Sequence, residues 1–267
     1  MTASGDKRGP TSADKVLGVL SLFSAEKPVW SPERAARRMR VSLATGYRYF
    51  NTLVACGMLE KLRRNQYVLG PAIIELDRKV RAADPVLMLA QPVMERLLRS
   101  LREPAAILLC RYYRQKVMCI HQETNRSGEP VSSYERGTLR PMFRGAPSKV
   151  ILAHLPPRTI VNLWRDHRRE IVATGMGPGF EEFKAALRVL RREPVNVSSS
   201  EVDEGRTGIA APIFDANGRV NGSLSIVLLS PPANKRAVAR LAMAVQAAAR
   251  DIERGRGASA SKTGSSP

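Results

Sequence analysis

The chain has 267 residues, 43% of them hydrophobic, and a formal net charge of +19 at pH 7. This length suits two compact domains, and this hydrophobic fraction excludes a wholly disordered protein. The charge favours an anionic partner such as nucleic acid. It is spread along the chain, since Lys and Arg outnumber Asp and Glu by 12 to 5 up to Gly70 and by 31 to 19 beyond it.

Other classes of protein are also disfavoured. No run approaches the ~18 apolar residues of a membrane span, and the polar N-terminus lacks the apolar core of a secretory signal. The cysteines Cys56, Cys110 and Cys119 form no C-x-x-C pair, which argues against structural zinc and suits a reducing compartment. We therefore expect a cytoplasmic protein with no membrane partner, no bound metal and three buried cysteines.

The N-terminal part predicts three helices. Residues 1–11 are polar and should form a disordered arm, and residues 12–24 have the spacing of an amphipathic helix. Ser31-Pro32-Glu33 supplies the N-cap, first-turn proline and early acid of a second helix. Ser42 caps a third helix, and Gly57 ends it by adopting a positive φ.

The third helix has two distinct faces. Its buried stripe is expected to comprise Leu43, Gly46, Phe50, Leu53 and Val54. The opposite face then carries Ala44, Thr45, Arg48 and Thr52, with Tyr47, Tyr49 and Asn51 at its borders.

The segment LEKLRRNQYVLG, residues 59–70, indicates a hairpin with Arg63 and Arg64 at its tip. Three helices followed by a basic hairpin are typical of a winged helix-turn-helix, in which the third helix enters the major groove and the wing contacts the DNA backbone. The alternative is a helical bundle whose polar face is merely solvated.

The rest of the chain predicts an α+β domain over residues 85–254. A linker helix is expected over 71–83, ended by Asp84-Pro85, so that residues 12–70 form the first domain and 71–84 the linker. A helix over 86–101 precedes strands at 105–113 and 116–122 and helices at 148–154, 159–167 and 181–192. A hairpin over 207–230 turns at Asn217-Gly218, a last helix covers 235–254, and residues 255–267 should form a disordered tail.

From about Ala13 to Ile252 the sequence resembles an IclR-type bacterial transcription regulator. The resemblance rests on SLATGYRYFNTLVACGMLEK with YVLGP, on RGTLRPMFRGAPSKVILAHLP, and on EVDEGRTGIAAPIFDANGRVNGSLSIVL. It implies an N-terminal all-α winged helix-turn-helix domain, a linker helix and a C-terminal GAF-like α+β domain with an antiparallel sheet. It also implies a homodimer or dimer of dimers, operator DNA as partner and a small organic acid as effector. We expect no cofactor.

The resemblance assigns site residues position by position. DNA contact falls on the third helix and the wing, namely on Ser42, Ala44, Thr45, Tyr47, Arg48, Asn51, Arg63 and Arg64. The effector site falls on Gly145, Ala146, Pro147, Ser148, Gly208 and Ser225.

Two departures from the family pattern stand out. Pro147 removes one backbone donor from the effector site, and Gly46 replaces a larger apolar residue, which should loosen the third helix against its core.

The effector site also follows from helix physics. A helix beginning near Pro147 presents unpaired N–H groups and a partial positive charge that attract a carboxylate. The alternative is that Ser148 merely caps a buried helix.

Two other functions were weighed. A hydrolase or transferase is disfavoured because His121, His154 and His167 lie in no catalytic motif, and Ser198-Ser199-Ser200 near Glu201 and Asp203 fits a loop before a strand. A non-specific architectural DNA-binding protein would not need a large α+β domain. The sequence therefore predicts a ligand-responsive transcription regulator with no catalytic residues.

Overall fold

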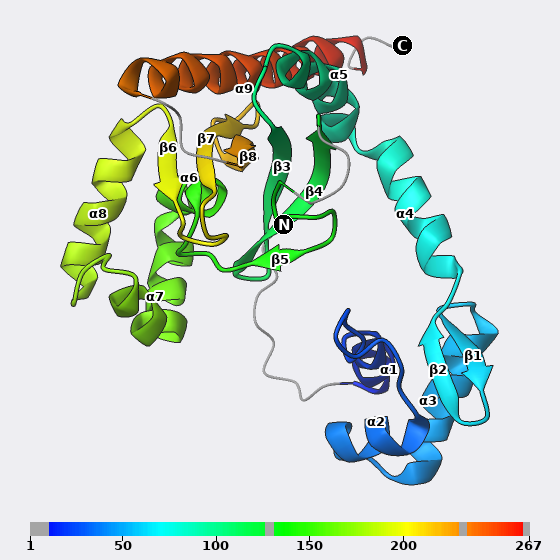
Figure 1. Cartoon of the computed structure of the whole chain (residues 1–267). Helices are drawn as coiled ribbons and strands as arrows, with labels where there is room; N and C mark the ends of the chain where they lie inside the picture. The colour runs from blue at the N-terminus through cyan, green and yellow to red at the C-terminus, as the bar shows by residue number, and fades with distance from the viewer. Residues whose placement is uncertain (1–10, 126–130, 230–233, 264–267) are drawn as a thin grey trace. The chain divides into compact units, whose positions relative to one another are not determined.

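The computed structural model in Figure 1 describes residues 11–125, 131–229 and 234–263, with side chains as far as Gly255. The chain folds as two compact units, Met1–Ala83 and Asp84–Pro267. Of the expected disordered arm, residues 1–10 lie outside the described residues. Thr11 caps the first helix, since its hydroxyl accepts a hydrogen bond from the Asp14 amide and the Asp14 carboxylate accepts one from the Thr11 amide.

The first unit is a winged helix-turn-helix. Ser31 and Ser42 cap the second and third helices as predicted, and Gly57 takes the expected positive φ of 70° after the third. The two strands pair antiparallel. The elements are α1 (Ser12–Leu20), α2 (Pro32–Met39), α3 (Leu43–Ala55), β1 (Leu59–Arg63), β2 (Gln66–Leu69) and α4 (Ala72–Ala83).

The buried face of α3 differs from the predicted stripe. Leu43 and Val54 are 52% and 38% exposed, whereas Tyr49 is only 4% exposed. At about 100° per residue, Leu43 and Val54 lie together beyond one edge of the arc of buried residues, whereas Tyr49 lies within that arc on its other side. The prediction was wrong at these three positions, and the buried residues are Gly46, Tyr49, Phe50 and Leu53.

Gly46 lets α3 cross α2 at close range. A Cβ atom at this position would lie 2.8 Å from the Pro32 carbonyl oxygen and 2.9 Å from the Ala36 Cβ. The expectation that a glycine here loosens the helix is therefore wrong, because the missing side chain is what permits the close approach.

The second unit is built on one antiparallel sheet. Among the described residues its strands run in the order β5-β4-β3-β8-β7-β6. Its helices are α5 (Pro85–Arg99), α6 (Ala146–Ala153), α7 (Pro157–Ala173), α8 (Phe180–Arg192) and α9 (Lys235–Thr263). Its strands are β3 (Ala105–Tyr113), β4 (Lys116–Thr124), β5 (Leu139–Arg140), β6 (Asn196–Ser199), β7 (Thr207–Phe214) and β8 (Val220–Leu228).

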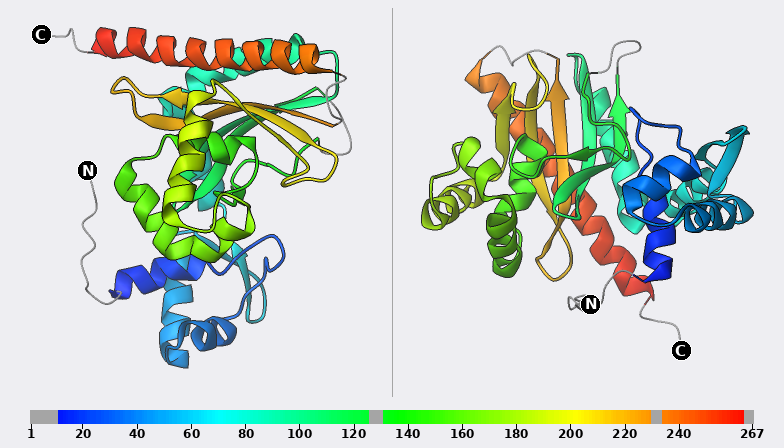
Figure 2. Two further views of the ribbon diagram at one scale, coloured as in Figure 1. Left: turned by 90° about the vertical axis from the view of Figure 1, so that its left-hand side faces the viewer. Right: turned by 90° about the horizontal axis from the view of Figure 1, so that it is seen from below.

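Helices cover both faces of this sheet, as Figures 1 and 2 show. Alternate residues of β3 divide between two cores: Ile107 and Leu109 pack with α5 and α9, whereas Ala106 and Leu108 pack with α6, α7 and α8. Ser225 of β8 pairs with Leu108 of β3 and with Ala210 of β7. Since side chains alternate across a sheet, Ser225 lies on the face that α6 covers.

Several local predictions needed correction. The edge strands β5 and β6 were not expected, and α9 continues past Arg254 to Thr263. The helix predicted to end at His167 is kinked at that residue and continues beyond it to Ala173 as α7. The expected disordered tail is thus helical as far as Thr263, and its last four residues lie outside the described residues. Cys110 and Cys119 are buried, but Cys56 is exposed. In the part of the chain that the structure describes, no helix is both long and apolar enough to cross a membrane.

Candidate DNA interface and effector pocket

The outer face of α3 is free of core packing. Ala44, Arg48 and Asn51 are exposed at the spacing i, i+4, i+7, which places them on one side of the helix. Ser42 is also exposed, but its hydroxyl caps α3 by accepting a hydrogen bond from the Thr45 amide at 3.2 Å. Arg48 therefore offers the charged group of this face, with short side chains around it.

Glu33 connects the recognition helix to the wing. Its carboxylate accepts hydrogen bonds from the Tyr47 hydroxyl and, at 2.6 Å, from the Asn65 side-chain amide. The Tyr47 hydroxyl also donates to the Asn65 side-chain oxygen at 3.0 Å. Hydrogen bonds from Asn65, Tyr47 and Ser31 lower the pKa of Glu33 to about 2. Tyr47, assigned to DNA contact by sequence, thus has its hydroxyl engaged in holding the wing.

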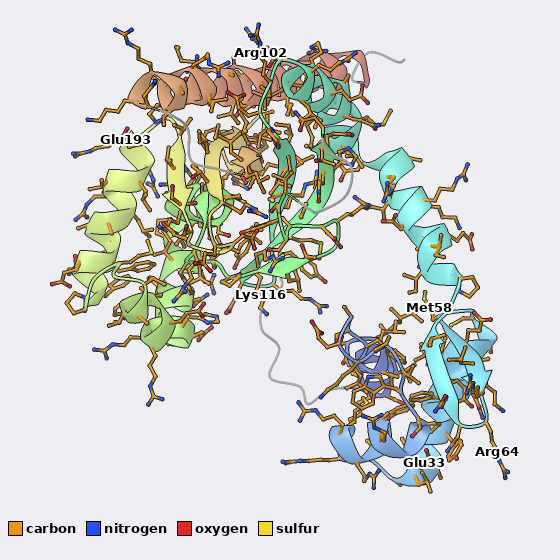
Figure 3. All side chains as sticks on the ribbon, in the orientation of Figure 1. Glu33, Met58, Arg64, Arg102, Lys116 and Glu193 are labelled. Atoms are coloured by element: carbon orange, nitrogen blue, oxygen red, sulfur yellow. The ribbon has the colours of Figure 1, made fainter. Side chains whose placement is uncertain are left out.

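The wing places its arginines in solvent. Arg63 ends β1, Arg64 begins the turn, and Asn65 takes a positive φ of 63° there. Figure 3 shows the Arg64 side chain pointing away from the hairpin. Both arginines are exposed, and within the described ranges no acidic group pairs with either one.

The sequence assignment missed basic residues on and after α2. Arg37, Arg38 and Arg40 are exposed, and none forms an ion pair with another described residue. Arg40 also forms the turn into α3 with a φ of 55°. The charge run RRMR was the available signal. These exposed cations are further candidates for phosphate contact.

In the second unit, a small cavity lies at the start of α6. Its volume is about 30 Å³, and four of the six residues assigned by sequence line it: Gly145, Ala146, Pro147 and Gly208. The other lining residues were not assigned. Ser132 and Tyr134 come from the segment shortly before α6, and the rest come from segments far beyond it in sequence: Ser198, Glu201, Val202, Asp203, Arg206 and Val227. Only folding brings these segments together.

The N-terminus of α6 already has partners. The Gly145 amide donates to the Glu201 carboxylate at 2.9 Å, and the Ala146 amide donates to the Ser198 hydroxyl at 2.8 Å. Pro147 has no N–H group. The expectation of an open set of N–H donors is therefore wrong for these first positions, because a distant loop supplies the acceptors.

Ser148 and Ser225 belong to α6 and β8, which both contribute to the cavity wall, but the two serines do not line it themselves. Both are 0% exposed, and neither hydroxyl has a hydrogen-bond partner among the described residues. The alternative that Ser148 caps α6 is wrong, since the N-cap is Gly145. Tyr134 is 3% exposed, and its hydroxyl also lacks a partner within the described ranges. Burial raises the pKa of Tyr134, so the group stays protonated.

Buried polar groups in folded proteins nearly always have partners. Three unpaired hydroxyls, one in the cavity wall and two on elements that form this wall, therefore indicate a place for a polar ligand or ordered water. Ser198, one of the serines considered for an enzyme, has a structural role. It lies on the edge strand β6, and its hydroxyl accepts a hydrogen bond from the Ala146 amide.

Comparison with known proteins identifies both units. Residues 12–63 match the model of the IclR helix-turn-helix domain, and residues 80–254 match that of the bacterial transcriptional regulator IclR C-terminal domain. The HTH-type transcriptional regulator KipR of Bacillus subtilis is 24% identical over 213 residues, which is 79% of this chain and 83% of KipR. BhcR of Paracoccus denitrificans is 25% identical over 255 residues, 94% of this chain and 88% of BhcR.

Solved structures share the fold. An IclR homolog from Microbacterium hydrocarbonoxydans, complexed with 4-hydroxybenzoate, superposes with a TM-score of 0.72 at 21% identity and covers 93% of this chain and 100% of its own. The Thermotoga maritima IclR superposes with a TM-score of 0.61 at 19% identity, over 92% of this chain and 98% of its own. The family consists of transcription regulators and not of enzymes. This chain belongs to the IclR family of DNA-binding transcription regulators and carries both its helix-turn-helix domain and its effector-binding domain.

Proposed function

We propose that the protein reads a specific operator sequence in the cytoplasm and that a small organic acid, bound at the start of α6, alters its operator affinity. The division follows the domains expected from sequence: residues 12–70 bind DNA, 71–84 link, and 85–254 hold the effector. The observation that carries the DNA half is the exposed face of α3, which carries Arg48, together with the exposed arginines of the wing.

The chemistry of that face fits duplex DNA. A guanidinium makes paired hydrogen bonds to guanine in the major groove, and short polar residues such as Thr45 and Asn51 reach other base edges. The exposed arginines of the wing and α2 fit phosphate, which adds affinity without sequence preference. Ser42 and Tyr47 support this surface, since one caps the helix and the other holds the wing.

Helix α4 supports a dimer as the operator-binding species. It buries no residue in the chain, and Ile74 and Val80 are 75% and 55% exposed. An apolar helix stripe without a partner fits the same stripe of a second copy, and a two-fold dimer reads two half-sites. A dimer of dimers would extend the operator to four half-sites.

The effector half rests on the unpaired hydroxyls of Tyr134, Ser148 and Ser225, which belong to segments that form the cavity wall. Hydroxyl groups satisfy a carboxylate or hydroxyl of a small organic acid, and 4-hydroxybenzoate in the related structure belongs to that chemical class. Such a ligand changes operator affinity only if it binds one dimer geometry better than another. A coupling of ~1–3 kcal/mol corresponds to roughly 5- to 150-fold in operator affinity.

The experiment compares Arg48→Ala with Arg188→Ala, which removes the same charge from an exposed position on α8. Binding to DNA from upstream of the protein's own gene and to unrelated DNA is measured by fluorescence anisotropy at fixed salt. We expect R48A to lose about tenfold or more in operator affinity, since a base-contacting arginine contributes ~1–3 kcal/mol. R188A should bind like the wild type.

Equal operator affinity in R48A and R188A would remove Arg48 from the interface. Equal wild-type affinity for every DNA, with a steep salt dependence, would favour the architectural alternative instead. Addition of small carboxylates to the wild-type complex tests the effector half separately.

A further inference from the structure

We propose that Glu201 is an internal competitor of the effector: its carboxylate occupies the anion position at the start of α6, and a carboxylate effector binds by displacing it. This inference rests on the proposed effector function of the same site. It adds the residue that sets the effector's affinity and its preference for charge.

The contacts of Glu201 are those of a bound carboxylate. One oxygen accepts from the Gly145 amide at 2.9 Å, and the other accepts from the Lys149 ammonium at 2.5 Å. Both donors belong to the start of α6, whose partial positive charge favours an anion. The Lys149 and Glu201 side chains are 19% and 30% exposed, so the pair is partly withdrawn from water but still open to exchange.

The residues around Glu201 show that the site is built for more than a structural ion pair. The Tyr134 hydroxyl, without a partner in the described part of the chain, would lie 3.2 Å from a Cβ atom at Gly145. The buried Ser148 hydroxyl, on the first turn of α6, is likewise unpaired. Glu201 thus accepts hydrogen bonds from Lys149 and the Gly145 amide, whereas the hydroxyls of Tyr134 and Ser148 remain without a partner in the described part of the chain.

The position of Glu201 in the cavity wall supports displacement. Glu201 and Val202 line the cavity from the loop between β6 and β7. A ligand that needs the Gly145 amide and Lys149 must therefore move the Glu201 carboxylate, which frees both donors and enlarges the cavity.

That loop has the properties of a movable element. Its ends meet through a hydrogen bond from the Ser200 amide to the Arg206 carbonyl oxygen at 2.9 Å, so it closes on itself. Its middle is held by Asp203, whose carboxylate accepts from the Ser133 amide at 2.9 Å. Rotation of the Glu201 side chain alone breaks its hydrogen bonds to the Gly145 amide and the Lys149 ammonium. Val202 packs against the hydrophobic core and can stay in place.

The first test is chemical complementation with acetate, a small carboxylate that resembles the end of a glutamate side chain. In Glu201→Ala, acetate should occupy the vacated position beside Lys149 and raise the thermal unfolding midpoint of the second unit in a saturable manner. Acetamide has the same shape without the charge and should have no such effect. Sodium chloride holds the ionic strength constant throughout.

The matched control is Glu204→Ala, which removes an exposed acid from the same loop. We expect the acetate concentration for half-maximal stabilisation to be at least about tenfold lower in E201A than in the wild type or E204A, because charge-assisted hydrogen bonds become available only in E201A. The double variant E201A with Lys149→Met should lose the response. If E201A does not fold, Glu201→Ser takes its place, since its short polar side chain also vacates the position of the carboxylate.

An equal response of E201A and the wild type to acetate, or an equal response of E201A to acetate and acetamide, would overturn the proposal. The proposed effector function can fail independently of this proposal. That would be the result if acetate stabilised E201A selectively but no carboxylate changed operator binding. Conversely, an operator response to carboxylates with no selective acetate effect in E201A would retain the function and reject Glu201 as the competitor.

Discussion

Replacing Gly46 with Ala adds one methyl group at the crossing of α2 and α3. Two effects oppose each other. Alanine favours a helix over glycine by about 1 kcal/mol. Against this, the new Cβ atom would stand 2.8 Å from the Pro32 carbonyl oxygen, where ordinary contact begins at 3.4 Å, and 2.9 Å from the Ala36 Cβ.

The crowding effect should be the larger one. Neither neighbour can rotate away, because one is a backbone atom and the other is fixed to its own helix. Overpacking of this kind costs about 1–3 kcal/mol, and two simultaneous contacts place it in the upper part of that range. We expect a net loss of about 1–2 kcal/mol, or about 4–8 °C in midpoint for each kcal/mol in a unit of this size.

The assay requires a signal from the first unit alone. Trp30 lies in its core at 8% exposure, and the other tryptophan of the chain, Trp164, lies in the second unit. In a Trp164→Phe background, fluorescence therefore follows the unfolding of the first unit. The control is Gly18→Ala in α1, where a Cβ would meet only the Met39 Cε at 3.6 Å.

G18A should raise the midpoint through helix propensity alone, whereas G46A should lower it. A midpoint for G46A equal to or above that of G18A would refute the inferred close crossing.

Two further predictions concern the sites themselves. Hydrogen bonds hold the pKa of Glu33 at about 2, below its ordinary 4.5, so its contribution to stability is present above pH 4.5 and is lost as the pH falls toward 2. Glu33→Gln should therefore flatten the fall of the Trp30 unfolding midpoint over this window relative to the control Glu60→Gln, and an unchanged pH profile would contradict the lowered pKa. Ser225→Ala removes a buried hydroxyl without a partner in the described ranges, so we expect a change within about 1 kcal/mol in unfolding free energy but a loss of the operator response to carboxylates. Ser223→Ala removes a hydroxyl that donates to the Pro147 carbonyl oxygen at 3.2 Å and should cost about 1 kcal/mol; the reverse order of stability in chemical denaturation would show that Ser225 has a partner.

Local signals in the sequence located most elements correctly. Ser31 and Ser42 cap helices, Gly57 takes a positive φ, and the Asn217-Gly218 turn joins β7 to β8 as predicted. Such features depend on a few consecutive residues, whose side chains and backbone preferences act within one turn. The order of these elements was enough to predict the winged helix-turn-helix.

The sequence did not reveal which side chains meet. The edge strands β5 and β6 form because neighbouring strands complete their hydrogen bonds. With two and four residues, they are too short to show the alternating pattern that predicts a strand from sequence. The close crossing of α2 and α3 at Gly46 depends on Pro32 and Ala36, which belong to the other helix. From sequence alone, the glycine was therefore expected to loosen the packing of α3, although it is what permits the close contact.

The clearest case is the start of α6. Sequence predicted the helix and its affinity for an anion, but the acceptors are Ser198 and Glu201, which lie more than fifty positions away in the chain. Nothing in either segment specifies the other, because the contact arises only when β6 joins the edge of the sheet beside β7. Local chemistry determined that a carboxylate would bind at this helix terminus, and only the tertiary structure decided that the chain supplies one itself.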